Sequence, residues 1–183
     1  RSTWCPWQAM PDGMRSVAGA LRLRLLLWVG LALLCIQIAL GGWTSANYAA
    51  FACGTDFPKC LDQWWPAMDF GQAFSLWHGP GIDYEHGVLA NNARVAIQMS
   101  HRLFAILVFG HLLAVGIRLL RTPGMRFWAL TLIVLVCTQV ALGISNVMFA
   151  LPLQVAVAPN AGAALLLFTL VSLLARLREP DEP

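Results

Sequence analysis

Apolar residues are grouped into four long segments of this chain. No charged residue occurs from Leu25 to Thr55 or from Phe127 to Ala175. A helix needs about 20 apolar residues to cross the hydrocarbon of a bilayer, and every segment is longer than that. The pattern therefore predicts an all-α integral membrane protein, a bundle of four transmembrane helices. The predicted spans are Leu21–Ala46, Val95–Ile117, Phe127–Ala150 and Leu153–Ala175.

The polar stretches around these spans define the domain organisation. Residues 1–20 are expected to form an N-terminal cytoplasmic segment outside the core, and residues 179–183 a cytoplasmic tail. Residues 21–178 form the membrane domain, with an external loop at 47–94. The chain has no initiator Met, which suggests a fragment or a trimmed chain. The first span lacks a suitable small-residue cleavage site, so it resembles a signal anchor more than a cleaved signal peptide.

The charges indicate which way the spans run. The chain is 58% hydrophobic and 11% charged, and its net charge of +3 is too small to indicate nucleic-acid binding. The loop 47–94 holds one Lys and five acidic residues before Arg94. Cytoplasmic loops of membrane proteins are enriched in Lys and Arg, so both termini are predicted in the cytoplasm and the loop in the periplasm of a bacterial inner membrane. The basic clusters are Arg15, Arg22 and Arg24, then Arg118, Arg121 and Arg126, then Arg176 and Arg178.

The external loop is too long to be expected without structure of its own. The segment from Asp69 to Trp77 fits a short interfacial helix with Asp69 as its N-cap. Tryptophans are enriched at membrane–water interfaces, and an outer aromatic belt is the preferred interpretation of those near this loop. They are Trp43, Trp64, Trp65 and Trp77.

An internal repeat links the first and third spans. The run that begins Cys35-Ile-Gln37 recurs as Cys137-Thr-Gln139, and both continue to Ala-Leu-Gly. Shared apolar residues alone could arise by chance, but the matching Cys and Gln favour a duplication. The four spans would then be two parallel helical-hairpin repeats. Carried into the second and fourth spans, the register aligns His101 with Pro159.

His101 and Arg102 are the main candidates for chemistry, because ionisable residues inside a span are costly. The imidazole could form an interhelical hydrogen bond, relay protons or ligate a metal, and axial ligation of haem is the sharper hypothesis. Arg102 could pair with a haem propionate or extend to a lipid phosphate. His111 is about 15 Å deeper and rotated by roughly 80°, so packing or hydrogen bonding is expected there. His78 and His86 are weak zinc candidates.

Two cysteines of the loop, Cys53 and Cys60, are seven residues apart with Gly54 and Pro58 between them. A structural disulfide is the preferred interpretation, and thiol exchange with a redox partner is the alternative. Inside the spans, Cys35 and Cys137 are expected to pack as small apolar residues. Interhelical hydrogen bonding or a polar lining is expected of Gln37, Gln139, Asn146 and Asn160. No hydrolase, nucleotide-binding or HExxH motif is present.

Taken together, these residues resemble the haem A synthase family (CtaA type). The matching stretches include Gln37 to Ala50, Cys53 to Cys60, Trp64 to Phe70, Ser100-His101-Arg102, Gln139 to Val147 and Asn160 to Ala164. The resemblance covers nearly everything after about residue 20, and it is to the C-terminal four-helix half of a family with two such halves. It implies two haem-ligating histidines in each half, and a haem b in this one. The family's activity is oxidation of the haem O methyl group to a formyl group, which serves cytochrome oxidase assembly.

The resemblance makes His101 the first iron ligand and puts Pro159 at the second, where proline offers no donor atom. The family's first half carries a carboxylate three residues before its histidine, and the position here is Gln98, which cannot act as a base. Pro159 would be tolerated in the first turn of a helix. The chain alone is therefore expected to be an incomplete oxidoreductase. The alternatives are a haem-binding electron carrier and a scaffold without haem.

The resemblance also implies partners. We expect membrane lipid, the missing N-terminal half or a second copy, a supplier of haem O, and a quinone or other electron acceptor.

Overall fold

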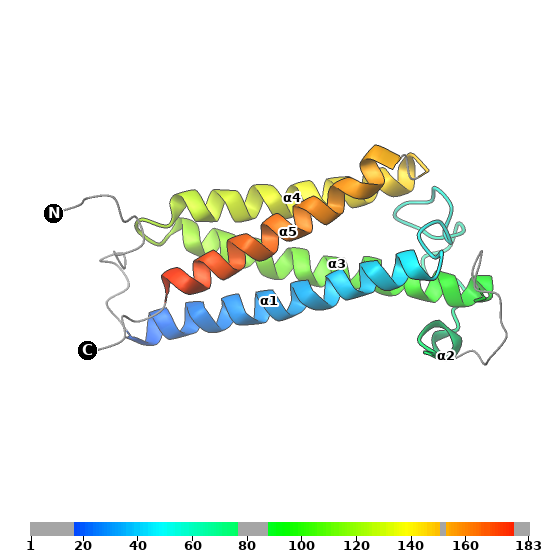
Figure 1. The fold of residues 1–183 in the computed structure, drawn as a ribbon, viewed down its shortest axis with the longest axis horizontal. Coiled ribbons are helices and arrows are strands. Elements are labelled where there is room, and N and C mark those ends of the chain that lie inside the picture. The colour runs from blue at the N-terminus through cyan, green and yellow to red at the C-terminus, as the bar shows by residue number, and fades with distance from the viewer. Residues whose placement is uncertain (1–16, 77–87, 151–152, 178–183) are drawn as a thin grey trace.

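The computed structural model describes residues 17–76, 88–150 and 153–177. Four long helices run alternately in opposite directions, as Figure 1 shows: α1 (Val17–Ala46), α3 (Asn91–Leu120), α4 (Arg126–Met148) and α5 (Leu153–Arg176). A short helix, α2 (Phe70–Ala73), lies in the loop between α1 and α3. All four long helices are long and apolar enough to cross a membrane. The predicted all-α membrane fold is confirmed.

Most predicted boundaries hold to within a few residues. The first span begins at Val17, so residues 17–20 of the predicted cytoplasmic segment are helical. The second begins at Asn91, which makes the last four residues of the predicted loop 47–94 part of α3. The remainder of the N-terminal segment and the tail 179–183 lie outside the described residues. Apolar length predicts the middle of a span well, because burial in lipid requires it, but helices continue past the hydrocarbon wherever backbone hydrogen bonds can continue.

The helices form a ring in which each packs on two neighbours. α1 contacts α3 and α5, and α4 contacts the same two helices from the opposite side. Each predicted hairpin therefore packs internally, α1 on α3 and α4 on α5. The duplication itself is not tested by these contacts and stays a prediction.

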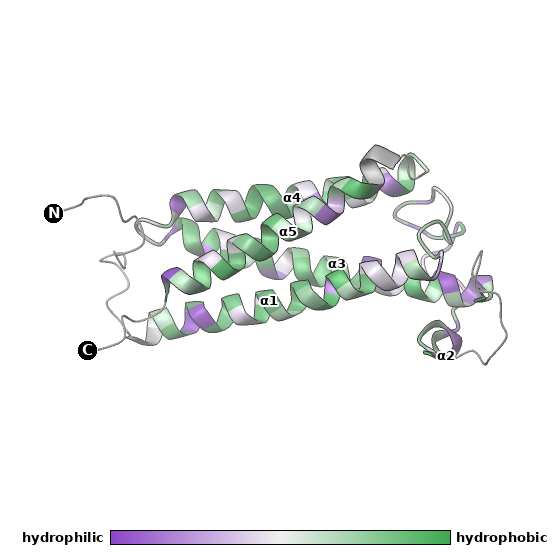
Figure 2. Ribbon diagram, in the orientation of Figure 1, coloured by the Kyte–Doolittle hydropathy of each residue, from purple (hydrophilic) through white to green (hydrophobic). Residues whose placement is uncertain are grey.

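The apolar cluster to which all four long helices contribute occupies one half of the bundle, the half where α1 begins and α5 ends. Leucines dominate it, and residues that are fully buried there include Leu27, Leu112, Leu132 and Leu170. Figure 2 shows hydrophobic residues along the middle of the helices and hydrophilic ones towards their ends. We call this packed half the basic half, because the described arginines of α1, α4 and the α3–α4 turn lie at its end, and the opposite half the outer half.

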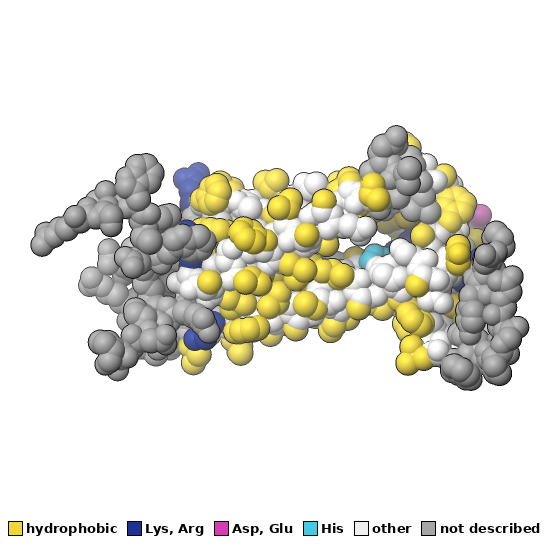
Figure 3. Space-filling view, in the orientation of Figure 1, with side chains coloured by type: hydrophobic (Ala, Val, Ile, Leu, Met, Phe, Trp, Pro, Cys, Tyr) yellow, Lys and Arg dark blue, Asp and Glu magenta, His cyan; other side chains and the backbone are white. Residues whose placement is uncertain are grey.

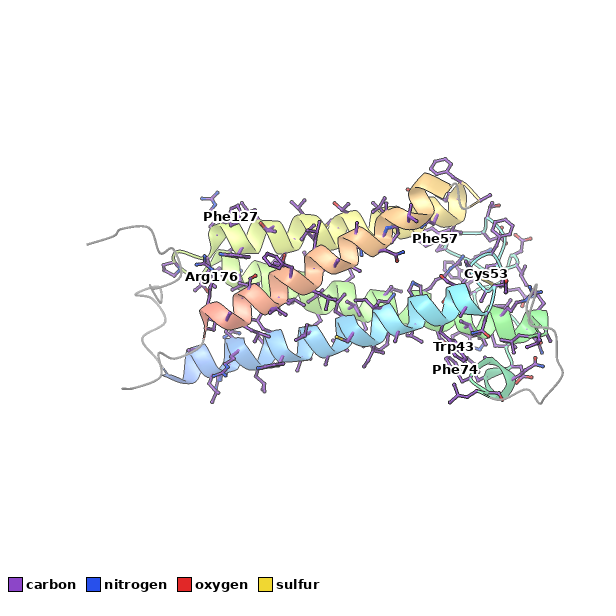
Figure 4. The ribbon with its side chains drawn as sticks, in the orientation of Figure 1. Trp43, Cys53, Phe57, Phe74, Phe127 and Arg176 are labelled. Atoms are coloured by element: carbon purple, nitrogen blue, oxygen red, sulfur yellow. A yellow bond between two sulfur atoms is a disulfide. The ribbon has the colours of Figure 1, made fainter. Side chains whose placement is uncertain are left out.

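The loop between α1 and α3 packs on the start of α3. As predicted, Asp69 caps α2: its Oδ1 accepts a hydrogen bond from Gln72 N at 3.0 Å. The helix is shorter than predicted, because it ends at Ala73, and Trp77 lies outside the described residues. Trp43 packs beside α2 and donates from Nε1 to Ala73 O at 2.9 Å (Figure 4). Trp64 and Trp65 are exposed.

The cysteines divide as the sequence suggested, with one correction. A disulfide joins Cys53 and Cys60, whose Cα atoms are 4.7 Å apart, and Gly54 turns the chain between them with φ +62°. Cys35 and Cys137 are free thiols on exposed faces of α1 and α4. They do not pack inside the bundle as expected, because the register of each helix turns them outward.

Candidate haem site in the outer half of the bundle

The outer half of the bundle lacks the apolar filling of the basic half. Among the described residues, no apolar side chain is fully buried on α1 after Leu34, on α4 after Val136 or on α5 before Leu166. The apolar residues buried on α3 at this level pack against α2 and the loop instead. Figure 3 shows a hollow between α5 and α1 in this half, with a histidine side chain visible inside it. The bundle is therefore open where the sequence places His101.

His101 lies on the part of α3 that faces α1. Gln37 Nε2 is 3.2 Å from each of its ring nitrogens and 3.3 Å from its backbone carbonyl oxygen. A Cβ atom added at Gly41, one turn after Gln37, would lie 3.3 Å from His101 Cε1. An amide and a glycine on one face of α1 thus define the position of the imidazole ring. An interhelical hydrogen bond, one of the alternatives considered for His101 and the commoner use expected of Gln37, is therefore present.

Arg102 binds the loop. Its Nη1 donates to Lys59 O at 3.0 Å, next to the disulfide at Cys60. Its Nε and Nη2 atoms are buried and have no hydrogen-bond partner. Neither expected role of Arg102, pairing with a propionate or with a lipid phosphate, is tested here. The contact to Lys59 was not predicted, because it joins residues 43 positions apart in the sequence.

Gln98 holds the same loop from one turn earlier on α3. It is buried, its Oε1 accepts from Cys53 N at 2.7 Å, and its Nε2 donates to Ala50 O at 2.9 Å. Both ends of the Gln98 amide therefore form hydrogen bonds. They satisfy one backbone N–H and one backbone carbonyl of the loop, and a buried backbone group without a partner would destabilise the fold. Sequence reasoning considered Gln98 only as a position that lacks a catalytic base. Its structural role is to fix the disulfide loop above His101.

Pro159 lies inside α5, which begins six residues earlier at Leu153. The expectation that it occupies a first turn is wrong. Proline has no backbone N–H, so one hydrogen bond of the helix is lost at this position and α5 is weakened there. Gln139 of α4 donates from Nε2 to Pro159 O at 2.9 Å, and a Cβ added at Gly162 would lie 2.6 Å from Gln139 Oε1. Gly162 therefore permits the close approach of Gln139 to α5.

Gln37 and Gln139 occupy corresponding depths. Each is nine residues before the last residue of its helix, Ala46 or Met148. At a rise of about 1.5 Å per residue, both are about 13 Å from that end. One contacts His101 and the other Pro159, the two positions that the proposed repeat register aligns. Several buried polar side-chain atoms of α1, α3 and α4 have no hydrogen-bond partner. They are Gln37 Oε1, Gln139 Oε1, Asn146 Oδ1, and Arg102 Nε and Nη2.

The remaining histidines do not join this group. His111 Nε2 is 2.9 Å from Leu26 O of α1, in the basic half, which confirms the expected packing and hydrogen-bonding role. His78 and His86 lie outside the described residues. Within the described ranges, no three His, Cys, Asp or Glu side chains gather at metal-ligand spacing. The arrangement around the hollow offers the imidazole of His101, the guanidinium of Arg102 and several amides. Such groups can ligate, orient and neutralise a bound molecule, and the described residues of the four long helices include no carboxylate.

Similarity to known proteins identifies the family of this chain. A family model, COX15-CtaA, described as cytochrome oxidase assembly protein, matches residues 2–171. A protein named heme A synthase from Shewanella oneidensis is 46% identical over 145 residues, which cover 79% of this chain and 44% of that protein. A heme A synthase from a Caulobacter species (strain K31) is 33% identical over 120 residues, 63% of this chain and 34% of that protein. No solved structure matches.

The aligned part of this chain thus spans less than half the length of either relative. Four apolar helices and bacterial relatives indicate a multi-pass bacterial membrane protein. The family model covers nearly the whole chain, and the chain belongs to the COX15-CtaA family of cytochrome oxidase assembly proteins.

Proposed function

We propose that this chain is the C-terminal, haem-binding half of a haem A synthase. In this role it supports oxidation of the haem O methyl group to a formyl group during cytochrome oxidase assembly. The observation that carries the proposal is the hollow outer half, where His101 stands among buried polar atoms in a bundle that is otherwise packed with leucine. A bundle core of this kind can hold a cofactor between facing helices.

The described residues fit a haem b. His101 supplies an imidazole nitrogen for iron, and Arg102 supplies two buried N–H groups without a partner, which suit a propionate carboxylate. When bound, haem supplies one-electron chemistry. The hydrogen bond from Arg102 Nη1 to the loop carbonyl of Lys59 would hold the guanidinium in position for a propionate.

Gln37 is the positioning residue for the imidazole. A ligating histidine usually gives its second ring N–H to an acceptor, which fixes the ring orientation. Gln37 Oε1 is buried without a partner, and rotation of the amide would present it to His101 in place of Nε2. The Gln37 amide can therefore form a hydrogen bond with the imidazole of His101 both without haem, through Nε2, and with haem bound, through Oε1.

The Pro159 side offers no nitrogen donor, so this chain supplies one axial ligand rather than two. We propose that catalysis belongs to the full-length protein, with the N-terminal four-helix half or a second copy as partner. A supplier of haem O and a quinone or other electron acceptor complete the proposed partners. The loop 47–94 is proposed to face the periplasm, with both termini in the cytoplasm.

The test is haem binding by the purified chain. The wild-type chain mixed with haem b is expected to give a Soret band with one haem per chain, and His101→Ala is expected to lose it. His111→Gln is the matched control, because this histidine is on the same helix and already forms a hydrogen bond with Leu26 O. If wild type gives no Soret band, or if His101→Ala keeps the wild-type spectrum, the proposal fails.

Restoring the second ligand tests the proposed site from its other side. Pro159→His is expected to convert the spectrum to that of a low-spin, bis-histidine haem, because the second helix then offers an imidazole. Pro159→Ala, which offers no donor, should keep the wild-type spectrum. An unchanged spectrum in Pro159→His would contradict the alignment of Pro159 with the second ligand.

A further inference from the structure

A second cavity lies in the basic half of the bundle, far from the hollow at His101. Its volume is about 530 Å³, which lies within the range of about 300–1,000 Å³ common for ligand sites. It opens between α1 and the end of α3, and none of the expected roles involves it. The residues that line it include Leu26, His111, Ala114, Val115, Arg118 and Arg121.

The lining of this cavity combines cationic and apolar residues. Arg118 and Arg121 are exposed, and the turn that ends α3 keeps them together, since Arg121 N donates to Arg118 O at 3.2 Å. His111 is seven residues before Arg118, which puts it about 10 Å further along the helix. Its Nε2 is engaged with Leu26 O. The lining therefore combines the two arginines with the apolar side chains of Leu26, Ala114 and Val115, and its one histidine is already hydrogen-bonded.

Among the residues that the structure describes, no carboxylate lies at the same end of the bundle as these arginines. The acidic residues that the structure describes, Asp56, Asp62 and Asp69, all belong to the loop at the opposite end of the bundle. Arg22 and Arg24 of α1 add further positive charge at the basic end. Figure 3 shows basic side chains at this end, and all of those described there are arginines. An anionic group is the natural complement of such a rim.

We propose that this cavity binds an anionic phospholipid of the adjacent leaflet. Its phosphate would lie between Arg118 and Arg121, and the first part of an acyl chain would extend along Leu26 and Val115. Basic pockets between transmembrane helices bind anionic lipid headgroups in this way. The apolar residues of the lining favour a lipid over free phosphate, because a free anion would gain nothing from burying them.

The test uses the purified chain in nanodiscs of phosphatidylcholine with a minor fraction of phosphatidylglycerol. Native mass spectrometry after release is expected to show phosphatidylglycerol retained above its share of the bilayer. Arg118→Gln and Arg121→Gln should each weaken retention by about fivefold, the effect of removing one arginine near an anionic surface. The control is Arg126→Gln, which removes an arginine of the same end that does not line the cavity. Circular dichroism of each variant checks that the helices remain.

Other results would overturn the proposal. Equal retention of both lipids by the wild-type chain would mean that the cavity selects no anionic lipid. An equal loss in Arg126→Gln would assign the effect to overall charge. Inorganic phosphate is added in a separate arm, and its competitive displacement of phosphatidylglycerol at millimolar concentration would make free phosphate the ligand.

Discussion

At the scale of single residues, the imidazole of His101 is positioned by groups on another helix. Gln37 and Gly41 are one turn apart on α1, so both face the same point on α3. Sequence reasoning identified His101 and considered Gln37 as a polar lining residue. Gly41 carried no such signal, because a glycine in an apolar run resembles any other small packing residue.

The role of Gly41 can be tested against the glycine beside it. A side chain at Gly41 would press on His101 Cε1, whereas a Cβ at Gly42 meets nothing within 4 Å. Overpacking of this kind costs about 1–3 kcal/mol, so Gly41→Leu is expected to lower haem affinity by about fivefold to a hundredfold. Titration of each purified variant with haem b, followed at the Soret band, measures the difference. Equal affinity in Gly41→Leu and Gly42→Leu would contradict the assigned contact.

At the scale of elements, α3 (Asn91–Leu120) connects the two halves of the molecule. Its outer part fixes the disulfide loop through Gln98 and carries His101, and its inner part packs closely on α4 at Gly116. A Cβ at Gly116 would lie 2.6 Å from Ile133 Cγ1. The apolar pattern alone predicted the helix, but it could not show which of its glycines faces a neighbour.

Replacing either of two glycines of α3 by alanine is therefore expected to change the stability of the bundle in different ways. Gly116→Ala should destabilise the bundle by about 1–3 kcal/mol, because the Ile133 side chain must move. Gly110→Ala meets nothing within 4 Å and should be neutral or slightly stabilising, since alanine is the better helix former. Thermal unfolding in detergent, followed by circular dichroism, compares them. A lower midpoint for Gly110→Ala than for Gly116→Ala would contradict the packing.

At the scale of the whole molecule, the two ends of the bundle differ in charge and in filling. Phe127 and Arg176 lie at the packed basic end, and Trp43 and Cys53 at the other (Figure 4). Arg176 there lies over the Trp128 ring, 4.8 Å from its centroid. The positive-inside rule applied to this difference in charge predicts that the basic end lies in the cytoplasm.

Cysteine labelling tests the orientation. In a chain whose free Cys35 and Cys137 are replaced by Ala, Asp62→Cys is expected to react with a membrane-impermeant maleimide in intact bacterial spheroplasts. Pro123→Cys, in the turn between α3 and α4, should react only after the membrane is permeabilised. The reverse labelling pattern would invert the predicted topology.

The sequence by itself determined the four spans, the capped turn at Asp69, the loop disulfide and the candidacy of His101. These depend on local properties: apolar length, capping chemistry, and the cost of an ionisable group in lipid. Only the tertiary structure decided which half of the bundle is packed and which is hollow. It also decided that Gln37 meets His101 across 64 residues, that Gln98 holds the disulfide loop and that Gln139 meets Pro159. Such contacts depend on how each helix is rotated against its neighbours, and that rotation follows from the packing of all four helices together.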